Sequence, residues 1–126
     1  VLMYHGTCFI DMINNMRGLS FETGAKIMTE LLKKRHIHPY YGGRTITPTP
    51  HDTMVINEIP DIFHCGESHN NSYDVYNGTV CVNSGTWQQI SEYQEAQGHK
   101  VTPCILPVFD MMRGKIKVVH FDREIE

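Results

Sequence analysis

The chain has 126 residues, of which 40% are hydrophobic and 20% charged, and its formal net charge is -3. These values suit a single domain over residues 1–126, exclude disorder as the default, and leave any DNA contact to a local basic patch. No apolar run approaches a membrane span and no signal peptide is present, so we expect a cytoplasmic protein with no membrane partner. The four cysteines lie far apart without a C-x-x-C pair, which is typical of reduced, buried thiols.

The first part of the sequence predicts a short strand followed by two helices. Val1–Tyr4 is an apolar run that ends at His5, so the strand delivers this histidine into a loop. Apolar residues at a helical spacing predict a helix over Cys8–Met16. A second amphipathic helix begins after Ser20, which caps it, and ends in the basic run Lys33-Lys34-Arg35.

This basic run and the loop after it hold the candidate DNA contacts. Lys33, Lys34 and Arg35 either complement the helix dipole in solvent or contact the phosphates of a DNA strand. His36–Pro50 contains three prolines and a Gly-Gly pair, which predict an ordered loop. Arg44 follows that glycine pair and either reaches a phosphate bidentately or forms a structural salt bridge.

The stretch from Pro60 to Trp87 is the centre of the predicted fold. It predicts a buried strand over Asp61–His64, a polar loop over Gly66–Ser72, and a hairpin of Tyr73–Tyr76 and Thr79–Val82 closed by Asn77-Gly78. A polar loop that carries histidine at the end of an apolar strand is where chemistry is expected, because the sheet holds the loop still.

The remaining segments predict short elements around this centre. We expect a short strand at Met54–Ile56, a short helix within Trp87–Ala96, and an extended edge segment over Val101–Val108, which contains two prolines. Val108–Met111 and Lys115–Phe121 form a last hairpin, and the charged tail Asp122–Glu126 frays. Strands outnumber helices, so the fold class is α/β or α+β with layered packing.

Several motifs resemble those of known proteins. Gly66-Glu67-Ser68-His69 resembles the Gly-His-x-His loop of calcineurin-like metallophosphoesterases, with a hairpin and an Asn-Ser-Gly turn after it. The segments HPYYGGRTITP, INEIPDIFHCGESH and VNSGTWQQISEYQ resemble the C-terminal part of the small subunit of archaeal family D DNA polymerases. The resemblance runs from Leu2 to about Phe109 and implies the C-terminal half of a layered metallophosphoesterase β-sandwich flanked by helices.

The resemblance also implies an activity, a metal site and partners. In the intact small subunit we expect a metal-dependent 3′→5′ proofreading exonuclease with two Mn²⁺ ions, or Mg²⁺, that acts on single-stranded DNA 3′ ends. The expected partners are the large catalytic polymerase subunit and the N-terminal half of the same subunit. The family's Tyr-His-Gly motif makes His5 a ligand, and its Gly-His-x-His loop makes His69 another.

Glu67 departs from the family pattern, because it stands where the family has a histidine. It is either a working ligand, since Mn²⁺ and Mg²⁺ accept oxygen, or a mark of decay toward a non-catalytic assembly subunit. His64 is expected at most to support the ligands. The remaining metal motifs are absent, so the catalytic residues are expected upstream of Val1, the chain looks like a piece of a longer protein, and alone it is expected to be inactive. A generic phosphoesterase acting on nucleotides is a further alternative.

Overall fold

The computed structural model describes residues 1–96 and 98–121, and its helices and strands confirm the predicted α+β class. The predicted tail, Asp122–Glu126, lies outside the described residues. In chain order the elements are β1 (Leu2–Met3), α1 (Phe9–Asn15), a 3₁₀ turn (Phe21–Thr23), α2 (Gly24–Lys34), β2 (Ile62–Cys65), β3 (Asn71–Tyr76), β4 (Thr79–Ser84), α3 (Glu92–Ala96), β5 (Ile105–Asp110) and β6 (Lys115–His120).

Four of the strands form a mixed sheet in the order β1-β2-β4-β3. β1, β2 and β4 are parallel, whereas β3 and β4 form the predicted antiparallel hairpin. Asn77 and Gly78 have φ values of 47° and 85°, as the two central residues of a type I′ turn require. The hairpin is longer than predicted, because β3 already begins at Asn71 and β4 continues to Ser84.

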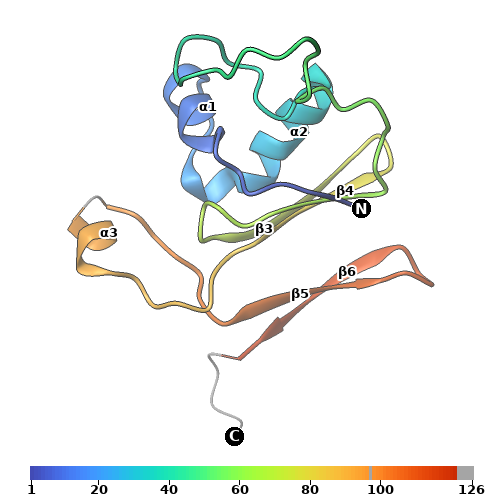
Figure 1. The fold of residues 1–126 in the computed structure, drawn as a ribbon. Coiled ribbons are helices and arrows are strands. Elements are labelled where there is room, and N and C mark those ends of the chain that lie inside the picture. The colour runs from blue at the N-terminus through green and yellow to red at the C-terminus, as the bar shows by residue number, and fades with distance from the viewer. Residues whose placement is uncertain (97, 122–126) are drawn as a thin grey trace, which may run out of the picture.

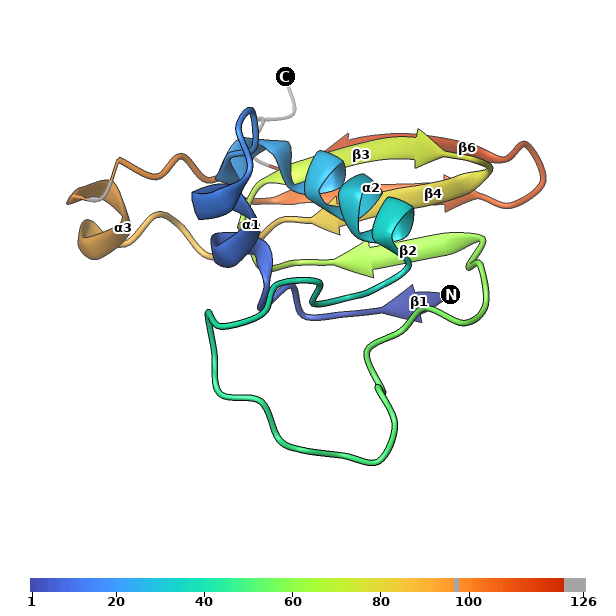
Figure 2. The ribbon, with the colours of Figure 1, turned by 90° about the horizontal axis from the view of Figure 1, so that it is seen from above.

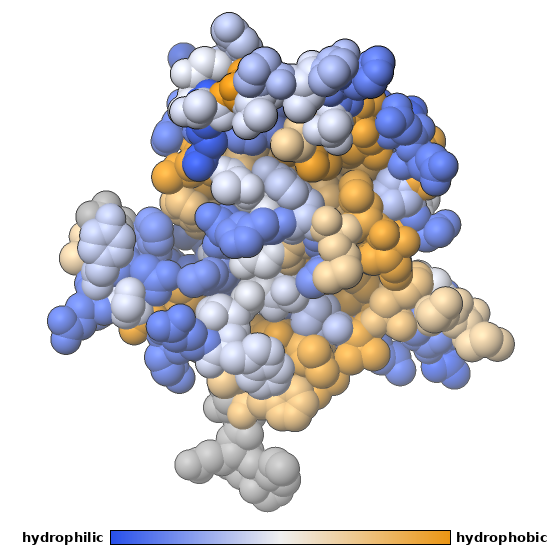
Figure 3. All heavy atoms as spheres, in the orientation of Figure 1, coloured by the Kyte–Doolittle hydropathy of each residue, from blue (hydrophilic) through white to orange (hydrophobic). Residues whose placement is uncertain are grey.

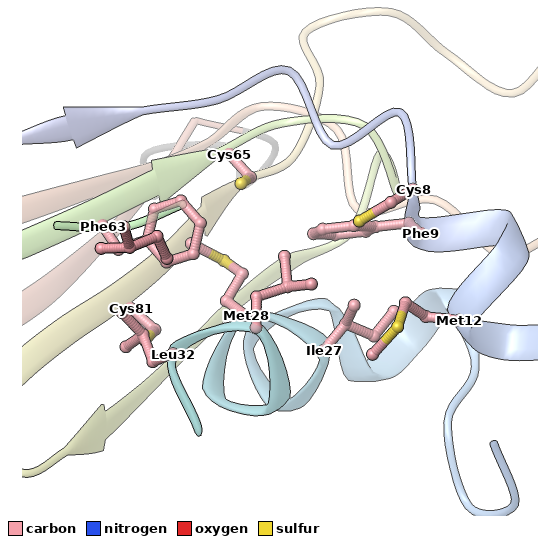
Figure 4. Packing of buried hydrophobic residues seen from close by; sticks show 11 residues of the cluster. Cys8, Phe9, Met12, Ile27, Met28, Leu32, Phe63, Cys65 and Cys81 are labelled. Carbon is pink, nitrogen blue, oxygen red and sulfur yellow. The ribbon is translucent and has the colours of Figure 1, made fainter. Parts of the chain in front are cut away.

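α2 packs over one face of this sheet, and α1 packs against α2 on the same side (Figure 2). The core between the layers is apolar and contains Phe63 of β2 and its partner Cys81 of β4, with Met28 and Leu31 of α2 against them, all at 0% exposure (Figure 4). The spacing of the buried residues along α2 explains this arrangement, because it places one apolar stripe against the strands. The two predicted helices are therefore confirmed, and so is the core-facing side of α2. On α1, however, Ile10 is 45% exposed and Met12 is buried, and the predicted cap Ser20 precedes the 3₁₀ turn, with α2 beginning at Gly24.

The hairpin of β5 and β6 forms a second, separate layer on the side of the sheet away from the helices (Figure 1). Trp87 packs on Phe121 at its base, with the ring centroids 5.6 Å apart. Exposed apolar side chains of this hairpin, including Leu106 and Val119, add to the apolar surface in the lower part of the molecule (Figure 3). The predicted layered arrangement, with helices outside one sheet, is thus present.

Three further predicted elements differ from the structure. Met54–Ile56 is not a strand, because only Val55 forms an isolated bridge, to His36. The helix within Trp87–Ala96 begins only at Glu92, because Ser91 accepts the backbone N–H of Gln94 and so starts the first turn. The extended segment predicted over Val101–Val108 is interrupted at Cys104, whose φ is 58°, and β5 starts after it.

The edge position predicted for the prolines of this segment holds for Pro107. It pairs with Val118 of β6, and in the described residues its strand has no other neighbour, so its missing N–H interrupts no ladder. Among residues 1–96 and 98–121, no helix is long and apolar enough to cross a membrane.

Candidate metal centre

The candidate site lies where the two neighbouring parallel strands β1 and β2 end. Met3 pairs with His64, and the Tyr4 N–H donates to the carbonyl of His64 over 2.9 Å. The loops that follow are therefore side by side, and the Gly66 N–H reaches the His5 carbonyl at 3.5 Å. Parallel pairing in this register explains how two residues far apart in the sequence, His5 and Glu67, come to share one site.

His5 and Glu67 are in direct contact. The Nδ1 atom of His5 lies 2.9 Å from Oε2 of Glu67, and their side chains are 73% and 37% exposed, so a dissolved ion can reach both. Gly6 permits this approach, because its φ is 112° and a Cβ there would lie only 2.5 Å from the Cβ of Glu67. A glycine is required at this position by both the backbone angle and the space.

His69 lines the same cavity from the far end of the loop. Its φ of 54° is left-handed, its N–H donates to Gly66, and its carbonyl accepts the N–H of Thr102 at 3.1 Å. Its Nδ1 atom lies 2.9 Å from the side-chain nitrogen of Gln94. The open cavity has a volume of about 380 Å³ and is lined by Met3, Tyr4, His5, His64, Cys65, Gly66, Glu67 and His69.

Burial keeps two other titratable groups at this cavity protonated. It raises the pKa of Tyr4 to about 12, and the phenol oxygen accepts the N–H of Cys8. Burial also raises the pKa of the Cys65 thiol, so this cysteine is poorly suited to act as a nucleophile. Tyr4 and Cys65 therefore line the cavity as neutral groups.

The geometry of His5 and Glu67 fits two neighbouring ligands of one divalent ion. Bonds of about 2.1 Å at right angles place adjacent ligand atoms about 3.0 Å apart, close to the separation seen here. In the part of the chain that the structure describes, however, no group of three His, Cys, Asp or Glu side chains is placed to hold a metal ion. The chain thus presents a pair of donors, and a complete ligand set with His69 stays a prediction.

The predicted DNA contacts lie on the helical side of the molecule and bond within the chain. Lys33 contacts Glu30 at 2.6 Å, and Lys34 lies 4.0 Å from the same carboxylate. The Arg35 guanidinium donates to the carbonyls of Ile56 and Asn57 at 2.8 and 2.7 Å, which ties the end of α2 to the following segment. DNA binding by these three residues stays a prediction.

Arg44 forms a structural salt bridge, which is the second of its two predicted roles. Its Nε donates to Asp11 over 2.8 Å, and this hydrogen bond raises the pKa of the guanidinium. Together with Lys34, Tyr40 and Tyr41, Arg44 also lines a second cavity of about 780 Å³ under the loop of residues 36–54. The ion pair leaves donors of the guanidinium free, so it is compatible with a phosphate contact.

Two residues that support the loop carry no sequence signal of their own. Asn83, at 0% exposure, donates from its amide to the hydroxyl of Ser68 and so fixes the loop between Glu67 and His69. Gln94 lies in α3, whose start the sequence pattern places too early. Its contact with His69 joins two residues that are 25 positions apart in the sequence. Neither periodicity nor motif spacing reveals such partners; only the fold brings them together.

Known proteins similar to this chain are subunits of an archaeal DNA polymerase. This chain is 42% identical to the DNA polymerase II small subunit of Methanocaldococcus jannaschii over 113 residues, which are 89% of the length of this chain. For the same subunit the identity is 46% over 96 residues (75% of the chain) in Archaeoglobus fulgidus, and 40% over 121 residues (95%) in Methanothermobacter thermautotrophicus.

The chain is thus a relative of the archaeal DNA polymerase II small subunit, and the predicted resemblance to the small subunit of family D polymerases is confirmed. It spans 19%, 20% and 25% of the lengths of these three relatives, or about a fifth to a quarter. No family model matches the chain.

Proposed function

We propose that this chain is a portion of a small subunit of an archaeal family D DNA polymerase, and that the complete subunit carries a two-metal 3′→5′ exonuclease. The observation behind this proposal is the contact between His5 and Glu67 at an open cavity, in a chain related to that subunit. The relatives match most of this chain, whereas this chain covers only about a fifth to a quarter of each relative. Further metal ligands would therefore come from the rest of the subunit.

His5 and Glu67 would hold one divalent ion, Mn²⁺ or Mg²⁺, between the ends of β1 and β2. Bound ions of this kind supply water activation and neutralise charge on a phosphodiester. The residues of this chain would position the ion, and Tyr4 beside them stays a neutral phenol that adds no charge to the site. The carboxylate of Glu67 supplies the negative charge that a hard cation prefers.

The proposed substrate is a single-stranded 3′ end, and the proposed partner is the large catalytic subunit of the polymerase. The second cavity supports a path for the strand, because Lys34 and Arg44 offer charge for phosphates there. Tyr40 and Tyr41 line the same cavity and offer rings on which bases stack.

A second candidate is a non-catalytic subunit that assembles the polymerase. Glu67 favours it, because a carboxylate replaces the imidazole of the related motif, and because the described residues hold no group of three metal ligands. Both candidates share the large subunit as a partner and differ only in whether His5 and Glu67 hold a metal ion.

The test uses the complete small subunit bound to its large partner. We would measure Mn²⁺-dependent removal of a mismatched 3′ nucleotide from labelled single-stranded DNA in His5→Ala, Glu67→Gln and Glu67→His. Glu58→Gln, at an exposed glutamate away from the cavity, is the control. We expect His5→Ala and Glu67→Gln to lose at least about tenfold in rate while the complex still assembles. No measurable removal by the unsubstituted complex, or a rate raised by Glu67→His, would favour the assembly role, and unchanged rates in His5→Ala and Glu67→Gln would refute the role of these two residues.

A further inference from the structure

The side chain of Gln94 links α3 to the candidate metal centre. α3 lies to the side of the main sheet (Figure 1), and Gln94 reaches from it to His69, where its Nε2 lies 2.9 Å from Nδ1 of the ring. At its other end, the Oε1 of Gln94 accepts two hydrogen bonds from Ser91, from the backbone N–H at 3.1 Å and from the hydroxyl at 3.2 Å. The amide therefore spans two fixed partners.

These partners determine which way the amide of Gln94 points. A backbone N–H is only a donor, so the group that faces it at hydrogen-bond distance has to be the amide oxygen. Turning the amide over would place its NH₂ group against the Ser91 N–H, with two donors facing one another. The NH₂ group consequently faces His69.

The orientation of Gln94 in turn determines the tautomer of His69. An amide NH₂ is a donor, so the Nδ1 atom of His69 must accept, and it carries no proton. A neutral imidazole has one N–H, which is then on Nε2. The backbone of His69 is held at both its N–H, by Gly66, and its carbonyl, by Thr102, so the ring stays beside Gln94.

This arrangement is the reverse of the one that metal ligands adopt. A histidine that binds metal through one nitrogen donates the N–H of the other to a carboxylate or carbonyl oxygen, which orients the ring. At His69, which lines the cavity, Nδ1 meets a donor, Gln94, and so the remaining ring nitrogen, Nε2, is protonated. The network does not fit His69 as a metal ligand.

We propose that Gln94 holds His69 as an N–H donor, which binds a phosphate oxygen in the cavity beside His5 and Glu67 in place of ligating metal. Gln94 is thus a positioning residue that acts through His69. The tautomer follows from the hydrogen bonds alone, whereas the phosphate as ligand rests on the proposed function.

The tautomer can be read directly by NMR. A long-range ¹H–¹⁵N spectrum of the ¹⁵N-labelled 126-residue chain at pH 8, where most imidazoles are neutral, should show His69 with its proton on Nε2. The signal is assigned by its absence in His69→Ala. In Gln94→Glu the new carboxylate accepts a proton from Nδ1, so we expect the pattern to switch. Gln89→Glu, which adds the same charge at an exposed site in the same segment, should not change it.

A proton on Nδ1 of His69 in the unsubstituted chain would overturn the proposal, and so would the same tautomer in the unsubstituted chain and in a folded Gln94→Glu. Neither reading requires metal, DNA or nuclease activity, so a failure of the proposed exonuclease leaves this result intact.

The consequence for ligands is tested by titration. Inorganic phosphate should shift the Nε2 signal of His69 in the unsubstituted chain and much less in Gln94→Glu. Mn²⁺ binding measured by calorimetry should strengthen at least about tenfold in Gln94→Glu, since its Nε2 becomes a free ligand. This gain should disappear in Gln94→Glu combined with His69→Ala. A gain that persists there would reflect the added charge alone and would contradict the proposal, as would the absence of any phosphate shift.

Discussion

Replacing Gly6 by alanine should separate His5 from Glu67 without substituting either residue. The new Cβ would lie 2.5 Å from the Cβ of Glu67 and 3.5 Å from a ring carbon of Phe9. The first distance is far below van der Waals contact, so either the loop of Glu67 or the backbone at residue 6 has to move. The 2.9 Å spacing between the His5 and Glu67 side chains is then lost.

The expected magnitude comes from two separate costs. A residue with a side chain at the φ of 112° found for Gly6 is strained by about 1–3 kcal/mol. The clash with Glu67 adds the cost of overpacking, about 1–3 kcal/mol. Gly18 provides a matched control, because its φ is 82° but no atom lies within 4 Å of its Cβ position. Gly18→Ala therefore carries the first cost alone.

Urea denaturation and Mn²⁺ calorimetry of the 126-residue chain would measure both effects. We expect Gly6→Ala to lower the free energy of unfolding by about 1–3 kcal/mol more than Gly18→Ala, and to weaken Mn²⁺ binding where Gly18→Ala does not. Equal losses of stability in the two variants, together with equal Mn²⁺ affinity, would refute the close approach of Gly6 and Glu67 as the feature that builds the site.

Three further predictions concern stability. Burial raises the pKa of the Cys8 and Cys81 thiols to about 11, so the folded chain retains protons that the unfolded chain releases from about pH 9. The contribution of these thiols to the free energy of unfolding, measured in urea, is therefore constant below pH 8, and the free energy of unfolding should fall as the pH rises from 9 to 11. Asn83→Ala removes a buried hydrogen bond to the loop and should cost about 1–3 kcal/mol in the same assay. Arg35→Ala frees two backbone carbonyls, so it should lower stability and leave the salt dependence of DNA binding unchanged.

Each of these has a result that contradicts it. Stability that rises with pH between 9 and 11 would mean that the two thiols are not buried in protonated form. Asn14→Ala, at an exposed asparagine, is the control for Asn83→Ala, and equal losses would show that the buried amide has no special role. A smaller salt slope in Arg35→Ala would assign this residue to a DNA contact after all.

Local patterns in the sequence predict much of this fold. The alternation around Asn77-Gly78 predicts the hairpin, and helical spacing predicts α1 and α2, because each signal depends on residues a few positions apart. The end of β2 at a polar, histidine-bearing loop is likewise a local signal.

The pairing of His5 with Glu67 comes from the register of β1 on β2, which no local pattern records, and only the resemblance to a known family pointed to both residues. The contact of Gln94 with His69 depends on how the segment after β4 folds back, so the sequence contains no sign of it. The predicted strand at Met54–Ile56 is wrong for a related reason. In the structure Val55 forms one isolated β-bridge, to His36, and among the described residues the segment has no neighbouring strand with which to pair.

The short length of β1 has a consequence for how ion binding and folding are linked. β1 has two residues and lies at the edge of its sheet, so Tyr4 and His5 are held mainly by this pairing. Local opening of such an edge separates His5 from Glu67 while the core between α2 and β4 stays folded. An ion bound by both residues therefore closes this edge, and at ten times its dissociation constant it would stabilise the closed form by about 1.4 kcal/mol. The Tyr4 amide donates to the carbonyl of His64, so slower hydrogen exchange at this amide when the ion is added would report that closure.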